Sequence, residues 1–424
     1  MTKVWREVTH RYAFVEYDGP PLEPVDLYTR KSGDEIVGQL YAFTDKGGRN
    51  VALRPEMTPT LARMVGAKAN SLRKPVRWFS IPQLFRYERQ QRGRLREHFQ
   101  LNVDIIGEPD VSADAELLAV AVDIMREFGL TQEDVRARVS DRRLLSALLH
   151  GLGATAEQLP AVFAVIDKIQ RQPKNISEDK LGAAGLDGSA AAAVVALAGT
   201  ADIDTLATQY GGLPGVAEPL GEVRRYLDRL DVLGVREWVS LDLSIVRGLA
   251  YYTGIVFELL DAKGELRAIC GGGRYDGLLG SLGGVELPAL GFGMGDVVLT
   301  ELLRDRGLNV TIDSPDFWIA SGGDGEADVA RAAAALRRLG SSVEYALRKQ
   351  QLAKQRKAAL SAGVAYFVTL EEGFAESGRI RVEELAERGA AGGAASPLMQ
   401  ALANVPATLD GLLAVLRDNP RMLV

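Results

Sequence analysis

The sequence predicts an α+β fold, in which helices flank an antiparallel sheet, a helical insertion interrupts the core, and an α/β domain follows at the C-terminus. Three observations predict it: residues 76–107 read as two long strands, the second of which alternates between apolar and polar, residues 141–234 are rich in Ala, Leu and Gly at helical spacing, and strands alternate with helices after residue 315. A chain of 424 residues also exceeds one compact core. We expect core segments over 1–140 and 235–307, the insertion over 141–234, and the C-terminal domain over 315–424.

The first core segment is expected to begin with a helix and to continue into strands. Val4, Trp5, Val8 and Tyr12 recur at helical spacing and predict an amphipathic helix over residues 4–16. Further expected elements are a hairpin over 40–53 with its turn at 45–48, a helix over 57–69, two long strands over 76–107, and a helix over 111–128 capped by Ser112.

The later elements are read from β-type residues, glycines and turn signals. We expect strands within 238–260, a hairpin turn at 262–264 and an apolar helix over 292–303. The glycine-rich segment 271–273 could be only a flexible turn, and it is a weak candidate for a phosphate loop because no Rossmann-type strand and helix flank it. The C-terminal domain should alternate strand and helix through 317–320, 327–339, 343–347, 352–362 and 365–370.

The composition is that of an ordinary globular chain without cross-links. The single cysteine, Cys270, excludes an internal disulfide, and the three histidines show no metal-ligand spacing, so we expect no metal site. No apolar run is long enough to span a membrane, and the N-terminus lacks the apolar core of a signal peptide, so we expect a cytoplasmic protein. The net charge of −6 does not exclude a nucleic-acid partner, because phosphate binding depends on local basic patches.

The most informative pattern is the alternation between residues 94 and 105. Apolar side chains occupy one face, and the other face carries Arg94, Arg96, His98, Gln100, Asn102 and Asp104. Arg86 and Glu88 share a face of the preceding strand, so a hairpin brings these polar groups together on a rigid sheet. Such a surface can bind a phosphate through arginine and a polar ligand through carboxylate and amide. On charge alone, an edge hairpin with a solvated face is the simpler interpretation.

Six segments, in order, resemble the motifs of one enzyme family. They are residues 17–22, 53–58, 85–89 with 98–100, 246–252, 272–278 and 291–295. The third is similar to motif 2 of the class II aminoacyl-tRNA synthetases, and the first and last are similar to motifs 1 and 3. The second resembles the segment that binds the amino acid's ammonium group, and the fourth and fifth resemble the two signatures of the histidyl branch. The C-terminal domain resembles the anticodon-binding domain of that family, so the resemblance covers nearly the whole chain.

The resemblance implies that ATP and histidine form histidyl-adenylate and pyrophosphate, and that the histidyl group then passes to the 3′ end of tRNA(His). The catalytic residues would be Arg86 and Arg247, both at the α-phosphate, where charge grows in the transition state. ATP would also contact Glu88, through the adenine amino group, and Arg94. Histidine would be bound by Glu56, Thr58 and Gln100 at its ammonium and by Asp104, Tyr252 and Tyr275 at its imidazole. Mg²⁺ would be carried in with ATP.

The resemblance also implies two surfaces for tRNA and a homodimer built by motif 1. One basic cluster lies at the motif 2 hairpin tip and consists of Arg89, Arg92, Arg94 and Arg96. The other lies in the C-terminal domain and consists of Arg348, Lys349, Lys354, Arg356 and Lys357. Gln91 and Arg92 would meet the acceptor end, and Lys354 and Arg356 the anticodon stem. Each cluster could instead be an ordinary solvated surface.

The sequence departs from the family pattern in three places. Val298 stands where motif 3 usually has an arginine for the γ-phosphate, and Ala250 stands where the first histidyl signature more often has an aspartate. The chain also begins inside the motif 1 helix, which would reflect a late start codon or weaken the dimer. The missing arginine favours an alternative, a non-catalytic paralogue such as the regulatory subunit of ATP phosphoribosyltransferase. Arg247, motif 2 and the C-terminal domain favour the enzyme, and a plain RNA-binding protein would leave the imidazole-pocket residues unexplained.

Overall fold

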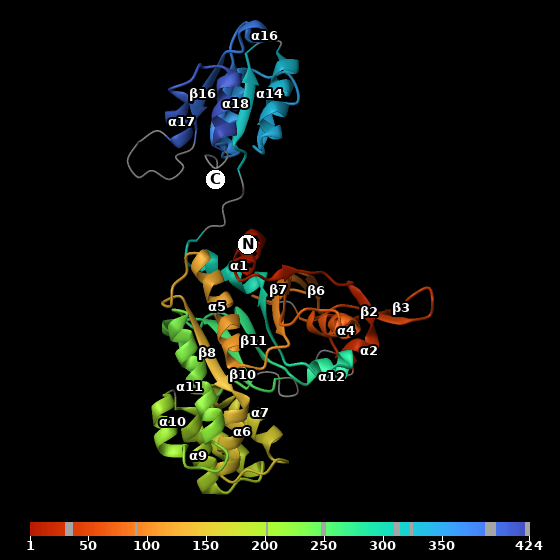
Figure 1. The fold of residues 1–424 in the computed structure, drawn as a ribbon, viewed down its shortest axis with the longest axis vertical. Coiled ribbons are helices and arrows are strands. Elements are labelled where there is room, and N and C mark those ends of the chain that lie inside the picture. The colour runs from red at the N-terminus through yellow and green to blue at the C-terminus, as the bar shows by residue number, and fades with distance from the viewer. Residues whose placement is uncertain are drawn as a thin grey trace. The chain divides into compact units, whose positions relative to one another are not determined.

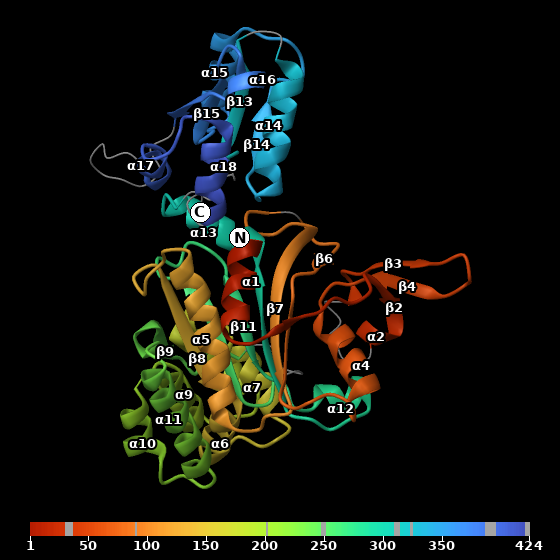
Figure 2. The ribbon, with the colours of Figure 1, turned by 45° about the horizontal axis from the view of Figure 1, so that its top comes forward.

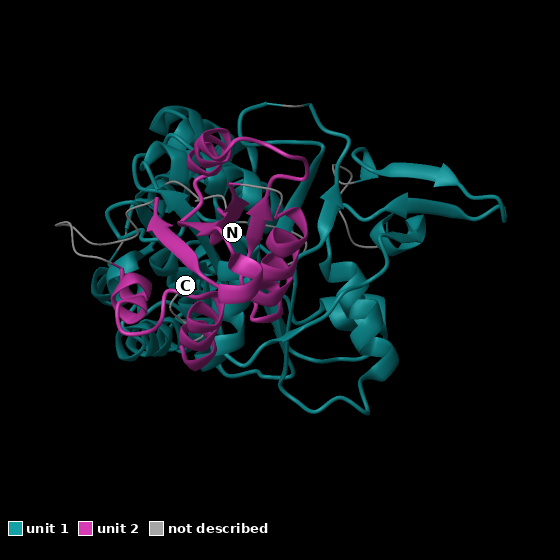
Figure 3. Ribbon diagram, turned by 90° about the horizontal axis from the view of Figure 1, so that it is seen from above, with its two compact units in different colours: residues 1–309 teal, residues 310–424 magenta. Residues whose placement is uncertain are grey.

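The computed structural model describes residues 1–29, 37–89, 91–200, 202–246, 252–308, 314–322, 325–385 and 396–419. The chain forms two compact units, Met1–Asn309 and Val310–Val424, which Figure 3 shows in different colours. Each unit has its own sheets and hydrophobic core. Across the described ranges, no helix has the length and apolar character needed to cross a membrane.

Unit 1 is built on a nine-stranded sheet with the order β1-β5-β7-β12-β11-β10-β8-β9, in which β6 also pairs with β7. Its strands are β1 (Val15–Glu16), β5 (Val76–Ser80), β6 (Gln83–Phe85), β7 (Glu97–Ile106), β8 (Val135–Asp141), β9 (Val239–Leu241), β10 (Ile255–Asp261), β11 (Cys270–Arg274) and β12 (Ala289–Gly295). Only the β1–β5 and β8–β9 pairs are parallel. The predicted α+β fold with an antiparallel sheet is therefore confirmed.

Helices cover one face of this sheet. The helix α5 (Val111–Glu127) contacts β7, β11 and β12 and packs against α1 (Thr2–Arg11), as Figure 2 shows. The helix α13 (Asp296–Asp305) follows β12 directly. Asp110 caps α5 by accepting a hydrogen bond from the Ser112 amide at 2.9 Å, so the predicted cap at Ser112 is wrong: Asp110 is the last residue with an extended backbone, as an N-cap requires.

A smaller sheet projects beside the main one and carries part of the site. It has the order β2-β4-β3 and is accompanied by short helices. These elements are β2 (Leu22–Pro24), α2 (Val25–Thr29), β3 (Tyr41–Thr44), β4 (Asn50–Leu53), α4 (Thr58–Lys68) and α12 (Leu278–Gly283). The predicted hairpin over 40–53 is confirmed, and its turn is held by Asp45, whose Oδ1 accepts from the amides of Gly47 and Arg49 at 2.9 Å.

A run of helices connects β8 to β9, in the region predicted as an insertion. They are α6 (Arg142–Gly151), α7 (Leu159–Ile166), η1 (Ile169–Arg171), α8 (Lys174–Ala183), α9 (Gly188–Ala198), α10 (Ile203–Tyr210), α11 (Ala217–Val232) and η2 (Arg236–Trp238). Figure 1 shows them gathered beyond one end of the main sheet. Their apolar side chains belong to the same hydrophobic cluster as the core under α5, so the insertion and the sheet form one unit.

Unit 2 is a small α/β domain with the sheet order β14-β13-β15-β16. Its elements are β13 (Phe317–Ser321), α14 (Glu326–Arg338), β14 (Val343–Tyr345), α15 (Leu352–Ser361), β15 (Tyr366–Leu370), α16 (Phe374–Ser377), β16 (Ile380–Glu384), α17 (Pro397–Leu402) and α18 (Leu409–Asp418). The strands β13, β14 and β15 are parallel and β16 is antiparallel. The predicted alternation of strand and helix is confirmed.

Two predicted helices of unit 1 are wrong in extent. The helix predicted over 4–16 ends at Arg11, because Ala13 adopts a φ of 59° and the next residues, β1, pair with β5. The helix predicted from residue 292 begins at Asp296, because Phe292 belongs to β12 and is paired on both sides, with β7 and β11.

The first of the two long strands predicted over 76–107 is also wrong. The strand β5 ends at Ser80, Ile81 and Pro82 separate it from β6, and β6 ends at Phe85. Proline cannot donate to a strand ladder, which explains the break. Arg86 and Glu88 therefore lie in an irregular segment after β6 and not on one face of a strand.

Candidate active site

A cavity of about 1200 Å³ opens on the face of the main sheet that α5 leaves uncovered. Strands β7, β10, β11 and β12 provide its floor, and the start of α4, the hairpin before β7 and the start of α13 provide its walls. The predicted site residues that line it are Glu56, Thr58, Arg86, Glu88, Arg94, Gln100, Asp104, Tyr252 and Tyr275. The fold therefore brings together side chains from both core segments.

Glycines keep the floor of the cavity open. Gly291 of β12 lies opposite Asp104 of β7, and a Cβ at Gly291 would lie only 2.1 Å from Asp104 Oδ1. A Cβ at Gly293 would likewise lie 2.9 Å from the Gln100 side chain. The Asp104 and Gln100 side chains thus lie over β12, and only glycine at the facing positions of β12 leaves room for them. Residues 271–273 are not the flexible turn that the sequence also allowed. They form β11, where a Cβ at Gly272 would be 2.4 Å from the Gly291 carbonyl oxygen.

A buried carboxyl group lies on this floor. The Tyr275 hydroxyl donates a hydrogen bond to Asp104 Oδ1, and the two residues are only 2% and 3% exposed. Burial raises the pKa of Asp104 to about 7, although the hydrogen bond from Tyr275 favours the charged form. The carboxylate can accept a hydrogen bond from an N–H group of a ligand. A ligand that provides one would further favour the charged form.

Arg86 is anchored to the segment that carries Glu56 and Thr58. Its Nε donates to the carbonyl oxygen of Pro55 at 2.9 Å, and α4 begins three residues later at Thr58. Arg54, just before this segment, donates to the Gly19 carbonyl at 2.6 Å and to Asp18 at 3.1 Å. These bonds hold a guanidinium, a carboxyl and a hydroxyl at one wall of the cavity.

An ion pair lies at the hairpin wall. The guanidinium of Arg94 is bound to the buried carboxylate of Glu88. Arg96 donates to the Glu88 carbonyl at 3.2 Å and stacks over the Tyr87 ring, 4.4 Å from its centroid. The hairpin reverses at Gly93, whose φ of 74° suits glycine. Two residues predicted to contact ATP are therefore already in contact with each other.

His98 lines the cavity, although it was predicted only as part of the polar strand face. Burial and the nearby Arg86 guanidinium lower its pKa to about 4, so the imidazole is neutral at physiological pH. The alternation along β7 placed His98 beside Gln100 and Asp104, and that alternation was the available signal.

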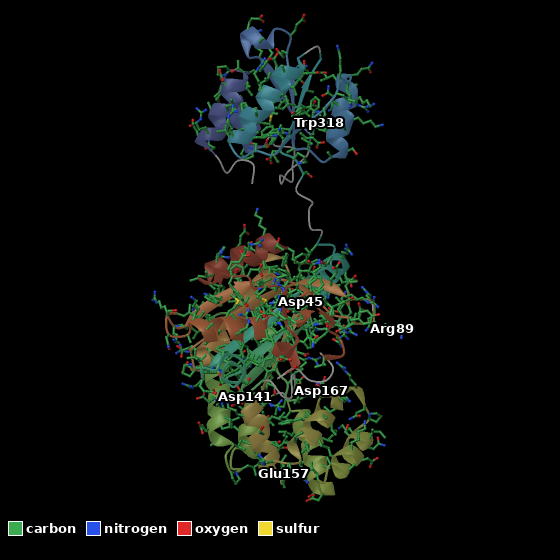
Figure 4. The ribbon with its side chains drawn as sticks, turned by 90° about the vertical axis from the view of Figure 1, so that its right-hand side faces the viewer. Asp45, Arg89, Asp141, Glu157, Asp167 and Trp318 are labelled. Carbon is green, nitrogen blue, oxygen red and sulfur yellow. The ribbon has the colours of Figure 1, made fainter. Side chains whose placement is uncertain are left out.

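Several charged cavity residues were missed. Asp167 and Arg171 come from the predicted insertion, Glu258 comes from β10, and Arg267 comes from the loop between β10 and β11. Figure 4 shows Asp167 where the insertion meets the rest of unit 1, with Glu157 farther away. No sequence signal could have found these residues, because their approach depends on packing between segments far apart in the chain.

Arg247 falls outside the described residues, as does Ala250. The remaining predicted site residues do not line the cavity. Gln91 and Arg92 lie at the exposed hairpin tip, where Arg92 Nε is 2.9 Å from Glu301 and its Nη2 is 3.2 Å from Asp305, both on α13. Arg89 is also exposed there (Figure 4).

Lys354 and Arg356 lie on α15 in unit 2, and Arg356 is paired with Glu383. Within the described part of the chain, no group of three or more His, Cys, Asp or Glu side chains is arranged to hold a metal ion.

An antiparallel sheet flanked by helices, with arginine, carboxylate and amide groups on its open face, defines the class II aminoacyl-tRNA synthetase fold. The model of the histidyl-tRNA synthetase family matches residues 5–296. The chain therefore belongs to the histidyl-tRNA synthetase family.

Known members of this family are similar to this protein along most of its chain. The histidine–tRNA ligase of Opitutus terrae is 45% identical over 366 residues, which are 85% of this chain and 84% of that protein. The chloroplastic/mitochondrial histidine–tRNA ligase of Arabidopsis thaliana is 40% identical over 383 residues, with 90% and 78% covered. The solved structure of histidyl-tRNA synthetase from Nostoc superposes with a TM-score of 0.79 at 22% identity and covers 91% of this chain and 90% of that one.

Proposed function

We propose that the protein is a histidine–tRNA ligase, which activates histidine with ATP to histidyl-adenylate and transfers the histidyl group to the 3′ end of tRNA(His). The observation that carries this proposal is the buried Asp104–Tyr275 pair on the floor of a large polar cavity. A buried carboxylate that can accept a further hydrogen bond from an N–H group selects an imidazole over an apolar side chain, because an apolar ligand cannot donate that bond.

The other cavity residues then have complementary roles. Arg86 and Arg247 hold the α-phosphate and stabilise the charge that grows there. Glu88 accepts a hydrogen bond from the adenine amino group, and Arg94 also contacts ATP. The ammonium of histidine is bound by Glu56, Thr58 and Gln100, and Tyr252 completes the imidazole pocket. The carboxylate of histidine is itself the nucleophile, so the reaction needs no nucleophilic residue from the protein.

The full enzyme would act in the cytoplasm as a homodimer, with Mg²⁺ arriving on the phosphates of ATP. Residues 1–140 and 235–307 would form the catalytic core, and residues 315–424 the anticodon-binding domain. Gln91 and Arg92 would meet the acceptor end of tRNA(His), and Lys354 and Arg356 its anticodon stem. The ion pairs of Arg92 and Arg356 would then have to open or be shared when tRNA binds.

The alternative, a non-catalytic paralogue, is not favoured. Relatives that are 40–45% identical over most of the chain, from organisms as distant as Opitutus terrae and Arabidopsis thaliana, are named histidine–tRNA ligases. A plain RNA-binding protein would not need a buried carboxyl group on the floor of a cavity.

Histidine-dependent exchange of pyrophosphate into ATP tests the proposal. We expect exchange with histidine and with no other common amino acid, and charging of tRNA(His) transcripts when tRNA is added. Exchange that responds equally to several amino acids would refute histidine selection. Absence of any exchange would support the non-catalytic paralogue.

A further inference from the structure

The cavity contains cationic side chains that the proposed roles do not use. Arg86 and Arg94 are bound to protein groups, at Pro55 and Glu88. In contrast, Arg171 and Arg267 line the same cavity, are exposed, and form no side-chain hydrogen bond or ion pair with any residue that the structure describes. Exposed arginines that line a cavity and are not engaged in an ion pair are suited to bind an anionic ligand.

Arg267 lies at the end of the sheet where α13 begins. The loop that carries it is closed by the Ile269 amide, which donates to the Leu259 carbonyl at 2.8 Å. From that point, one row of paired residues crosses the sheet through Leu259, Cys270, Met294 and Leu101. The next residue of β12, Gly295, directly precedes α13. The Arg267 loop and the first turn of α13 are therefore at the same end of the cavity floor.

The first turn of α13 carries no cationic side chain at this end of the cavity. Its cavity-lining side chains are Val297 and Val298, and Asp296 precedes them. A triphosphate at this end therefore needs a cation from another element. Arg171 is the less suitable candidate, because the adjacent residue, Gln170, is bound to Asp242 and Ser244, which follow the edge strand β9. Arg171 is thereby held toward that edge of the sheet and not at the first turn of α13.

We propose that Arg267 binds the β- and γ-phosphates of ATP and stabilises the pyrophosphate that leaves. The inference rests on the proposed ligase function. In the activation step, a carboxylate oxygen of histidine forms a bond to the α-phosphorus, and the bond from that phosphorus to the bridging oxygen of the β-phosphate breaks. The electron pair and its negative charge go to pyrophosphate, next to the Arg267 guanidinium.

The test compares ATP with AMP, which lacks the phosphates that Arg267 would contact. By calorimetry on the full-length protein, Arg267→Ala should weaken ATP binding by about 10- to 100-fold and leave AMP and histidine binding unchanged. The KM for pyrophosphate in the exchange reaction should rise. Arg267→Lys should recover part of the loss, because it keeps the charge but not the planar fork. Lys263→Ala is the matched control, since it removes a positive charge from the same loop outside the cavity.

Three outcomes would overturn the inference: unchanged ATP binding by Arg267→Ala, an equal loss of AMP binding, or an equal loss of ATP binding in Lys263→Ala. Unchanged ATP binding would show that Arg267 does not contact ATP. An equal loss of AMP binding would place the contact at the α-phosphate or the adenosine. An equal loss in Lys263→Ala would show only a long-range effect of charge. Failure of the proposed function is distinct, because it would appear as a lack of histidine-dependent exchange in the unsubstituted protein. The comparison of ATP with AMP binding does not depend on that exchange.

Discussion

The main sheet of unit 1 buries charged side chains, whereas the sheet of unit 2 buries apolar ones. Arg274, Asp104 and Asp114 are 3–4% exposed in unit 1. In unit 2, the core around Phe317 and Val368 is apolar, and none of its buried residues in the described ranges is charged. The charged groups of unit 2 lie on its surface, as in the Arg356–Glu383 pair.

The difference shows what each sheet must do. A cavity floor that recognises polar groups has to bury carboxyl groups, and each buried charge needs a partner to offset its lost hydration. Outside the cavity, the same rule holds for Asp114 of α5, whose partner is Arg274 of β11; Arg274 also donates to the carbonyl oxygens of Glu108 and Asp110. Unit 2 presents its charges to solvent, where they affect stability little and remain available to a ligand.

Removal of a buried arginine should show the largest effect. Arg274→Ala leaves Asp114 without its partner, although burial already raises the pKa of Asp114 to about 6. We expect a loss of about 3–5 kcal/mol in the unfolding free energy of unit 1, measured by chemical denaturation. Arg381→Ala is the matched control in unit 2, where the 3.6 Å pair with Glu371 is exposed, and it should change stability by less than about 1 kcal/mol. Equal losses in both variants would abolish the comparison.

The next test separates catalysis from stability within unit 1. Arg247→Ala should reduce histidine-dependent exchange by about 2.7–4 kcal/mol, or roughly 100- to 1,000-fold, because such an arginine acts mainly in the transition state. Histidine affinity and the melting temperature should change little, unlike in Arg274→Ala. A decrease of less than about tenfold in exchange would assign Arg247 a structural role.

The pH dependence of stability should reveal the buried carboxyl group of the floor. The pKa of Asp104 rises from 3.8 to about 7 on folding, so the folded protein binds this proton more tightly than the unfolded chain does. Its contribution therefore lowers stability as pH rises through that window and becomes constant above it. Asp104→Asn removes this contribution. Its melting temperature relative to the unsubstituted protein should rise across the window, and a difference independent of pH would contradict the assignment.

The smallest effect on the fold should come from the surface charges of unit 2. Neutralising Lys354, Arg356 and Lys357 together should weaken tRNA binding and flatten its salt dependence by about one unit of slope per lost phosphate contact. Pyrophosphate exchange without tRNA and the stability of unit 2 should both be retained. If tRNA binding keeps its full salt dependence, this surface does not contact tRNA.

Patterns within a short stretch of sequence correctly predicted the elements whose structure depends on neighbouring residues in the chain. The two-residue period of β7 predicted a polar face with Gln100 and Asp104, and the turn around Asp45 predicted the β3–β4 hairpin. The strand β11 was missed because glycine usually disfavours strands. Its glycines are explained by the close approach of β12, which is not visible in the segment itself.

The candidate site was predictable to the same extent. Side chains within recognisable motifs, such as Arg86 and Tyr275, meet in the cavity, and the resemblance supplied their roles. Asp167, Arg171 and Arg267 belong to no motif, and they reach the cavity only because distant segments pack together. The ion pair of Arg92 with α13 likewise depends on tertiary structure, because its partners are two hundred residues away in the chain.

The way in which the insertion joins the sheet affects how the family can diversify. The chain leaves the sheet after β8 and returns as β9, a parallel neighbour at the sheet edge, and the insertion helices form the crossover that such a neighbour requires. Helices can be gained or lost between these two strands without changing the register of β7, β12, β11 and β10. A change in the length of this crossover would reshape the rim of the cavity, where Asp167 and Arg171 lie, and would leave the strand pairing of its floor in place.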